Sequence, residues 1–123
     1  MNYIALNGTA FQPEGRVTKS GMAVLTFRLS YYQGKGKDGK AAYGRIKVTA
    51  FDRLAKAWDG QLKERDKVIV SGRITLNKWE KDGQTHYEHR LIADDIGQEI
   101  NLFADSNMNF VKGSYIPDED VPF

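Results

Sequence analysis

Four aromatic residues in the middle of the chain share the parity of their segments with basic residues. The aromatic members are Tyr32, Tyr43, Phe51 and Trp79, and the basic members are Arg28, Arg45, Lys47 and Arg73. Since strand side chains point alternately to two faces, each ring shares a face with a cation. Flat rings stack on nucleobases and cations neutralise phosphates, so the pattern favours binding to single-stranded nucleic acid. Aromatic residues also favour strands and cations favour solvent, so ordinary composition explains part of the pattern.

The glycine-rich segment 34–40 adds further lysines. It matches the first part of a phosphate-binding loop, G-x-x-x-x-G-K, but Ala41 stands where a magnesium-binding hydroxyl is required. The segment lies between two strand patterns, and Asp38-Gly39 is a favoured hairpin turn. We therefore predict a hairpin tip. Its Lys35 and Lys37 are candidates for phosphate binding, and a purely solubilising role is the alternative.

No grouping of residues predicts catalysis. His86 and His89 are the only histidines, and residues three apart on a strand point to opposite faces, which argues against a shared metal ion. Neither has an evident serine partner, and no pair of acids lies at a known catalytic spacing. We expect a binding protein without catalytic residues, metal or cofactor. A nuclease, the enzyme alternative, would need a metal cluster that the sequence does not offer.

The elements that would position these side chains follow from periodicity. Alternation with a period of two predicts strands over about residues 3–8, 22–32, 42–51, 67–79 and 84–94. Residues 52–62 change to helical spacing, with Asp52 as the expected N-cap. Five strands with one short helix between the third and fourth are typical of the oligonucleotide/oligosaccharide-binding (OB) barrel. The predicted fold class is all-β, a five-stranded OB-fold barrel followed by a mostly disordered C-terminal tail.

Each strand divides into a buried and an exposed parity. Residues 67–79 do so over the longest stretch, because Val68, Val70, Ile74 and Leu76 alternate with polar and basic residues. Gly72 falls on the buried parity, where a missing side chain lets a strand bend or another backbone approach. The remaining expected core residues are Leu25, Phe27, Leu29, Tyr31, Ile46, Val48 and Ala50, with Trp58 closing one barrel end.

Composition bounds the kind of protein. The 123 residues suit one domain with an appendage, and the absence of cysteine suggests a reducing compartment. No apolar run approaches the roughly 20 residues that cross a bilayer, and no secretory signal is visible. We expect a cytoplasmic protein with no membrane partner. Residues 1–96 hold 17 of the 18 Lys and Arg but 11 of the 16 acids, so a basic body precedes an acidic tail.

Five short motifs occur in an order and spacing that is fairly specific. They are I-A-L-N-G at 4–8, Q-P-E at 12–14, A-F-D-R-L-A at 50–55, G-R-I-T-L-N-K-W at 72–79 and P-D-E-D-V-P-F at 117–123. Together they resemble the bacterial single-stranded DNA-binding protein family. The resemblance implies a nucleoid-associated homotetramer of OB barrels that coats and protects single strands, without sequence preference, in DNA replication, recombination and repair.

The resemblance also bears on individual residues. Trp79 and Phe51 fall where the family carries stacking aromatics, whereas Arg45 stands at a position that is often aromatic, with Tyr43 two residues earlier. The implied organisation is an OB-fold single-stranded DNA-binding domain over 1–96, a flexible linker over 97–116 and an acidic partner-binding tip over 117–123. Whether Arg45 or Tyr43 takes the stacking role stays open.

The tip has a physical logic of its own. Three acids followed by a rigid Val-Pro and a terminal Phe can dock into a basic pocket with an apolar floor. The expected partners are DNA replication and repair proteins. The partner-binding residues are Asp118, Glu119, Asp120, Val121, Pro122 and Phe123.

Two alternatives to single-stranded DNA binding differ in class from an enzyme. One is an RNA-binding OB protein of the cold-shock kind, although no matching aromatic-rich RNA motif occurs. The other is an interaction module whose barrel only oligomerises while the tail binds partners.

Overall fold

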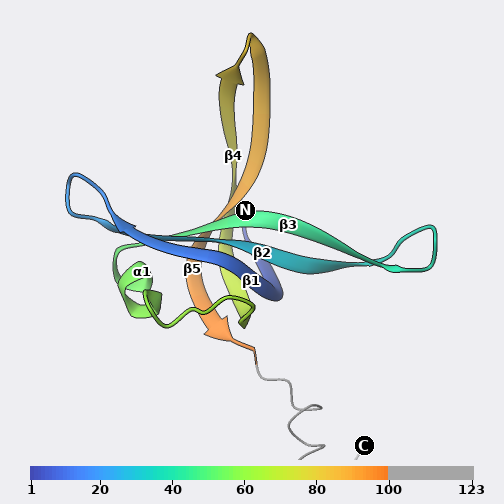
Figure 1. Cartoon of the computed structure of the whole chain (residues 1–123), viewed down its shortest axis with the longest axis horizontal. Coiled ribbons are helices and arrows are strands. Elements are labelled where there is room, and N and C mark those ends of the chain that lie inside the picture. The colour runs from blue at the N-terminus through green and yellow to red at the C-terminus, as the bar shows by residue number, and fades with distance from the viewer. Residues whose placement is uncertain (100–123) are drawn as a thin grey trace, which may run out of the picture.

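A closed barrel of five strands forms the body of the molecule (Figure 1). The computed structural model describes residues 1–99, and its strands are β1 (Ile4–Val17), β2 (Ala23–Lys35), β3 (Ala41–Phe51), β4 (Lys67–Lys81) and β5 (Gln84–Gln98). They close in the order β1-β2-β3-β5-β4, with β3 and β5 parallel and the other four neighbouring pairs antiparallel. The helix α1 (Asp52–Trp58) joins β3 to β4. The predicted five-stranded OB-type barrel is therefore confirmed.

Most of the residues that the alternation predicts for the core do lie in it. Phe27, Leu29, Val48, Val68 and Val70 are fully buried, and Tyr31 and Ile74 pack against them as partly buried side chains. Gly72 is also explained, because a Cβ at this position would run into the carbonyl group of Ile92. A bulge between Ser71 and Gly72 accompanies this close approach, as expected for a strand that bends around a small barrel.

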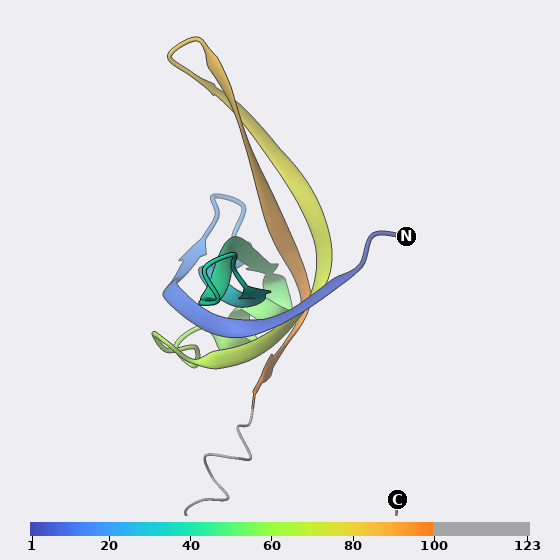
Figure 2. The ribbon, with the colours of Figure 1, turned by 90° about the vertical axis from the view of Figure 1, so that its right-hand side faces the viewer.

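Beyond the barrel, β4 and β5 continue as a two-stranded arm that stands well clear of the other strands (Figures 1 and 2). We define the arm as residues 76–89, which pair only with each other. Asp82-Gly83 closes it as predicted, with φ of 53° and 76°, the left-handed values that a type I′ turn requires. Leu76 was expected in the core, but it is 55% exposed. That prediction is wrong because neither face of the arm has a core to cover it.

The first strand runs farther than predicted. β1 continues through Pro13 to Val17, and its register with β2 shifts between Phe11 and Glu14. Gln12 has a positive φ of 55° at this bulge. The irregularity absorbs the proline, which has no N–H to give to the ladder, so the strand bends instead of ending. β5 likewise runs to Gln98, beyond the predicted end near residue 94.

The helix differs from its prediction at both ends. Phe51 occupies the N-cap position without a side-chain hydrogen bond, and Asp52 is the first helical residue, with a φ of 54°. Asp52 is therefore not the N-cap, because it lies one position inside the helix. The helix ends at Trp58 instead of reaching Leu62, and Gly60 turns the chain with a φ of 76°.

The helical side chains still pack as the spacing predicts. Ala55 and Leu62 are buried, and Leu54 and Trp58 pack against the barrel core. Figure 1 shows α1 against one end of the barrel, away from the arm. None of the helices within residues 1–99 is long and apolar enough to span a bilayer. The predicted tip, and the predicted linker from residue 100 onward, lie outside the described residues.

Candidate nucleic-acid interface

The outer face of the barrel carries three adjacent rows of side chains, set by strand register. In the first, which we call the cationic row, Arg28 on β2 is paired with Lys47 on β3, and Lys47 with Arg90 on β5. The second row joins Thr26, Thr49 and Ile92 in the same way. The third pairs Val24 with Phe51. The face therefore changes from charged to hydroxyl-bearing to apolar within three rows.

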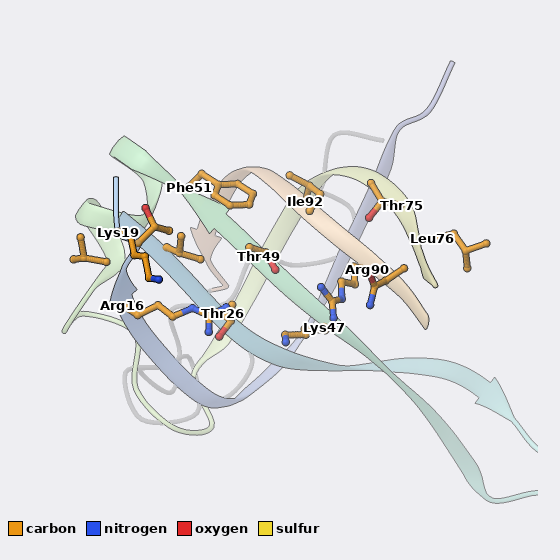
Figure 3. Close-up of a pocket in the computed structure, with 14 residues that line it drawn as sticks. Arg16, Lys19, Thr26, Lys47, Thr49, Phe51, Thr75, Leu76, Arg90 and Ile92 are labelled. Atoms are coloured by element: carbon orange, nitrogen blue, oxygen red, sulfur yellow. The ribbon is translucent and has the colours of Figure 1, made fainter. Parts of the chain in front are cut away.

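A groove of about 540 Å³ lies over these rows, between the β1–β2 loop and the base of the arm (Figure 3). Among residues 1–99, four cations and no carboxylate line it. The lining residues are Arg16, Val17, Thr18, Lys19, Val24, Thr26, Lys47, Thr49, Phe51, Thr75, Leu76, Asn77, Arg90 and Ile92. Positive charge without acids, together with hydroxyl and amide donors, is suited to an anionic chain such as a phosphodiester backbone.

Two of the predicted site residues meet in this groove. Phe51 is 41% exposed at one end of it, and Lys47 lies on its floor (Figure 3). Arg28 is the next residue along the cationic row and shares a smaller neighbouring hollow of about 180 Å³ with Lys47. Arg73 does not line the groove, but it is paired with Ile92, which does.

Tyr32 and Tyr43 form a pair on the β2–β3 hairpin, outside the groove. They are opposite each other in the register, and their ring centroids lie 5.8 Å apart with planes tilted by 46°. Both rings are more than half exposed. Arg45, two residues from Tyr43, lies with its guanidinium 6.0 Å from the ring centroid of Phe11. Arg45 and Tyr43 thus each lie beside an aromatic ring of the same chain, and the stacking role stays open between them.

Lys35 and Lys37 lie near the tip of the same hairpin. In the tip, the backbone N–H of Gly36 donates to the Lys40 carbonyl oxygen and that of Gly39 to the Gly36 carbonyl oxygen, and the amide of Lys40 donates to the Asp38 carboxylate. Both lysines are exposed, and neither lines the groove. Figure 1 shows this tip and the β1–β2 loop pointing in opposite directions. The predicted hairpin is confirmed, and the role of its lysines stays a prediction.

Trp79 lies on the arm, where His86 supports it from the opposite strand. The two residues are register partners, and their rings stack with centroids 5.5 Å apart and planes 20° apart. Trp79 remains 40% exposed. Its parity on β4 is that of Thr75 and Asn77, which line the groove, so the ring continues the same face outward along the arm.

Sequence reasoning missed several groove residues. Arg16, Lys19 and Arg90 supply three of its four cations, and Thr26, Thr75 and Asn77 supply polar groups. A parity count on residues 84–94 would have placed Arg90 with His86 and Ile92. No local signal could have placed Arg16 or Lys19, because the β1 bulge sets where the end of β1 lies.

One acid, Glu88, lies among the cations of this face. Its Oε1 is 3.8 Å from Arg28 Nη1, and its Oε2 is 3.6 Å from Arg90 Nε. Among the described residues, the buried Arg90 Nε has no hydrogen-bond partner. Within residues 1–99 no three His, Cys, Asp or Glu side chains gather as a metal site.

Comparison with known proteins identifies the family. The model of the single-strand binding protein family matches residues 1–98. The chain belongs to this family. It is a family of binding proteins rather than enzymes, in agreement with the non-catalytic class that the sequence predicts.

Individual members of the family share no more than about a third of their residues with this chain over the aligned regions described below. The single-stranded DNA-binding protein of Aquifex aeolicus is 29% identical over 80 residues, covering 63% of this chain and 54% of that protein. That of Thermus aquaticus is 28% identical over 100 residues, covering 76% of this chain and 37% of that protein. Single-stranded DNA-binding protein 2 of Streptococcus agalactiae serotype V is 30% identical over 95 residues, with 72% of each chain covered. The chain spans about half, or less, of the first two relatives.

Solved structures share the fold. A small single-stranded DNA-binding protein from Streptomyces coelicolor aligns with a TM-score of 0.68 at 24% identity, covering 80% of this chain and 94% of that one. A deletion mutant of the Thermus aquaticus protein aligns with a TM-score of 0.67 at 27% identity, covering 82% and 51%. The barrel is thus that of the family.

Proposed function

We propose that the chain binds single-stranded DNA without sequence preference. The observation that carries this proposal is the groove of about 540 Å³, which four cations and no carboxylate of the described residues line. Family membership and the names of the relatives support it. The function is binding and protection of exposed strands, not turnover of them.

The three rows suggest how a strand would lie. Lys47 and Arg90 would neutralise phosphates, and the hydroxyl groups of Thr26 and Thr49 would contact the sugar-phosphate backbone. Phe51, at the apolar row, would stack on a base, a contact worth about 1–3 kcal/mol. Every base has a stacking face and every nucleotide a phosphate, so this arrangement reads no sequence.

The rings outside the groove would extend the path. Trp79 would stack on a base along the arm, and Tyr32 and Tyr43 on the β2–β3 hairpin, while Arg45 and Arg73 would contact phosphates. A strand of several nucleotides would then run from the groove onto the hairpins. Lys35 and Lys37 would contact it where it leaves the barrel.

The wider role remains part of the proposal. The protein would act at the nucleoid as a homotetramer in DNA replication, recombination and repair. It would recruit the proteins of these processes through Asp118, Glu119, Asp120, Val121, Pro122 and Phe123. The resemblance of 117–123 to the family's acidic tip supports this role.

Titration with oligo(dT) while following tryptophan fluorescence tests the binding proposal. Trp79 is exposed on the proposed path, whereas Trp58 packs at the barrel end, so quenching should come from Trp79 and disappear in Trp79→Phe. An oligonucleotide of mixed sequence should bind with similar affinity, and duplex DNA of equal length more weakly. Absence of both quenching and binding at low ionic strength would favour the interaction-module alternative.

A further inference from the structure

We propose that Glu88 is a built-in counter-ion for Arg28 and Arg90, and that a phosphate of the bound strand displaces it. The inference rests on the proposed binding of single-stranded DNA and gives Glu88 a role in it, as the group that a phosphate replaces at Arg28 and Arg90. It concerns the cationic row and not the stacking rings.

The row is an unfavourable arrangement for the free protein. Arg28, Lys47 and Arg90 lie directly opposite one another on three neighbouring strands. Like charges in register destabilise a sheet unless an anion lies between them. Glu88 is the one acid that forms ion pairs with this row within residues 1–99, and it reaches only the two arginines at its ends. Lys47, in the middle, has no ion-pair partner among the described residues.

Glu88 satisfies its partners only in part. Its carboxylate oxygens lie 3.8 Å from Arg28 and 3.6 Å from Arg90, longer than the roughly 2.7–2.9 Å of a charge-assisted hydrogen bond. The buried Arg90 Nε is left without a hydrogen-bond partner among the described residues. A buried donor without an acceptor is unfavourable, and a ligand that supplies the acceptor recovers that free energy.

A phosphodiester group suits this position better than the carboxylate does. Arginine forms paired, short hydrogen bonds to phosphate oxygens, and the groove gives a strand direct access to Arg90 and Lys47. The Glu88 side chain is 29% exposed, so it can rotate toward solvent when a strand enters. Glu14 also lies near the row: it lines the smaller hollow beside Arg28 and Lys47, and among the described residues it forms no ion pair.

If a phosphate displaces Glu88, the carboxylate competes with the DNA, so removal of its charge should strengthen DNA binding. Glu88→Gln keeps the shape of the side chain and should tighten oligo(dT) binding by about twofold to fivefold at low salt, the range of a partly exposed ion pair. The gain should shrink as salt rises, because it is electrostatic. Glu88→Asp, which draws the carboxylate back by one methylene, should give a smaller gain.

Glu80→Gln is the matched control. It removes the same charge from the same hairpin, but Glu80 is exposed near the tip and forms no ion pair among the described residues. A gain in Glu88→Gln that exceeds the gain in Glu80→Gln supports displacement. Equal gains, or weaker binding in Glu88→Gln, would overturn it.

A double-mutant cycle with Arg90→Met isolates the contact itself. Arg90→Met should weaken binding and reduce the salt slope by about 0.7, one phosphate's share for a single strand. In that background Glu88→Gln should lose part of its benefit, whereas purely additive effects would contradict a shared site. If wild type itself fails to bind oligo(dT), the proposed function has failed. If wild type binds oligo(dT) but Glu88→Gln gains no more affinity than Glu80→Gln, the displacement proposal alone has failed.

Discussion

The groove and the arm both present aromatic and basic side chains, but the groove lies over a packed core and the arm does not. The groove lies on the outer face of a closed barrel, where Val24 and Thr49 are buried and Phe27 and Val48 belong to the core. The arm has two strands and no core, and it exposes a ring on each face, Trp79 and Tyr87. A two-stranded hairpin alone is only marginally stable, so the arm takes its shape from cross-strand pairs.

Because of this difference, we expect the barrel and the arm to contribute to binding in different ways. The barrel holds the cationic row, which gains from exact spacing because several cations must meet successive phosphates. The arm holds Trp79, whose contact with a base depends little on position because any base offers a stacking face. We therefore expect changes in the groove to alter affinity and salt dependence together, and changes on the arm to alter affinity alone.

The largest expected effect separates the two supports by stability. Leu29 is fully buried in the barrel, so Leu29→Ala should lower the free energy of unfolding by about 2–5 kcal/mol. Leu76 is 55% exposed at the base of the arm, so Leu76→Ala should change it by no more than about 0.5 kcal/mol. Urea unfolding monitored by circular dichroism measures both. Similar losses in the two variants would mean that the arm is packed in solution.

The next effect concerns the centre of the cationic row. Lys47→Glu places an acid between two arginines on the path of the phosphates, and like-charge contact with the strand should weaken binding by about 2–4 kcal/mol. Lys67→Glu is the control, since Lys67 begins β4 at the end farthest from the arm. Affinities for oligo(dT) at several salt concentrations decide between them. Equal losses would indicate a diffuse field of charge instead of a groove.

On the arm, the two faces can be compared directly. Trp79→Ala should weaken oligo(dT) binding by about 1–3 kcal/mol with little change in salt slope. Tyr87→Ala removes an exposed ring from the other face, where Lys78 covers it at 5.8 Å, and should leave affinity nearly unchanged. A larger loss from Tyr87→Ala than from Trp79→Ala would mean that the DNA contacts the Tyr87 face of the arm, contrary to the proposal.

The smallest effect tests the support of Trp79. His86→Ala removes the ring that stacks on it, so binding should weaken by about 0.5–1.5 kcal/mol, the value of an aromatic pair. In the Trp79→Ala background the same substitution should have almost no effect. Additive losses would instead assign His86 a contact of its own with DNA.

Local pattern predicted the barrel well. Period-two alternation located every strand and most of the core, since burial on one face is a local constraint on residue type. The Asp82-Gly83 turn was equally readable, because few dipeptides accept two left-handed residues. Leu76 and Asp52 were misjudged because tertiary geometry decides them: how far β4 outruns its neighbours, and where the helix begins relative to Phe51.

The candidate site was predictable only where its residues alternate within one strand. Lys47 and Phe51 follow from β3 alone, and both line the groove. Arg90 joins them through the parallel pairing of β3 with β5, and Arg16 through the bulged end of β1. Neither pairing leaves a mark in the sequence near these arginines. The sequence also did not show that Trp79 lies on the arm while Phe51 lies on the barrel.

The central claim is that a single strand lies across a cationic groove, and a salt series of filter-binding measurements with labelled oligo(dT) tests it most directly. Log affinity should fall linearly with log salt, and the four cations of the groove alone predict a slope of about −3 at roughly 0.7 per phosphate. The slope should lose about one phosphate's share in Arg90→Met. Failure to retain oligo(dT) at low ionic strength, or an affinity that ignores salt, would contradict the account.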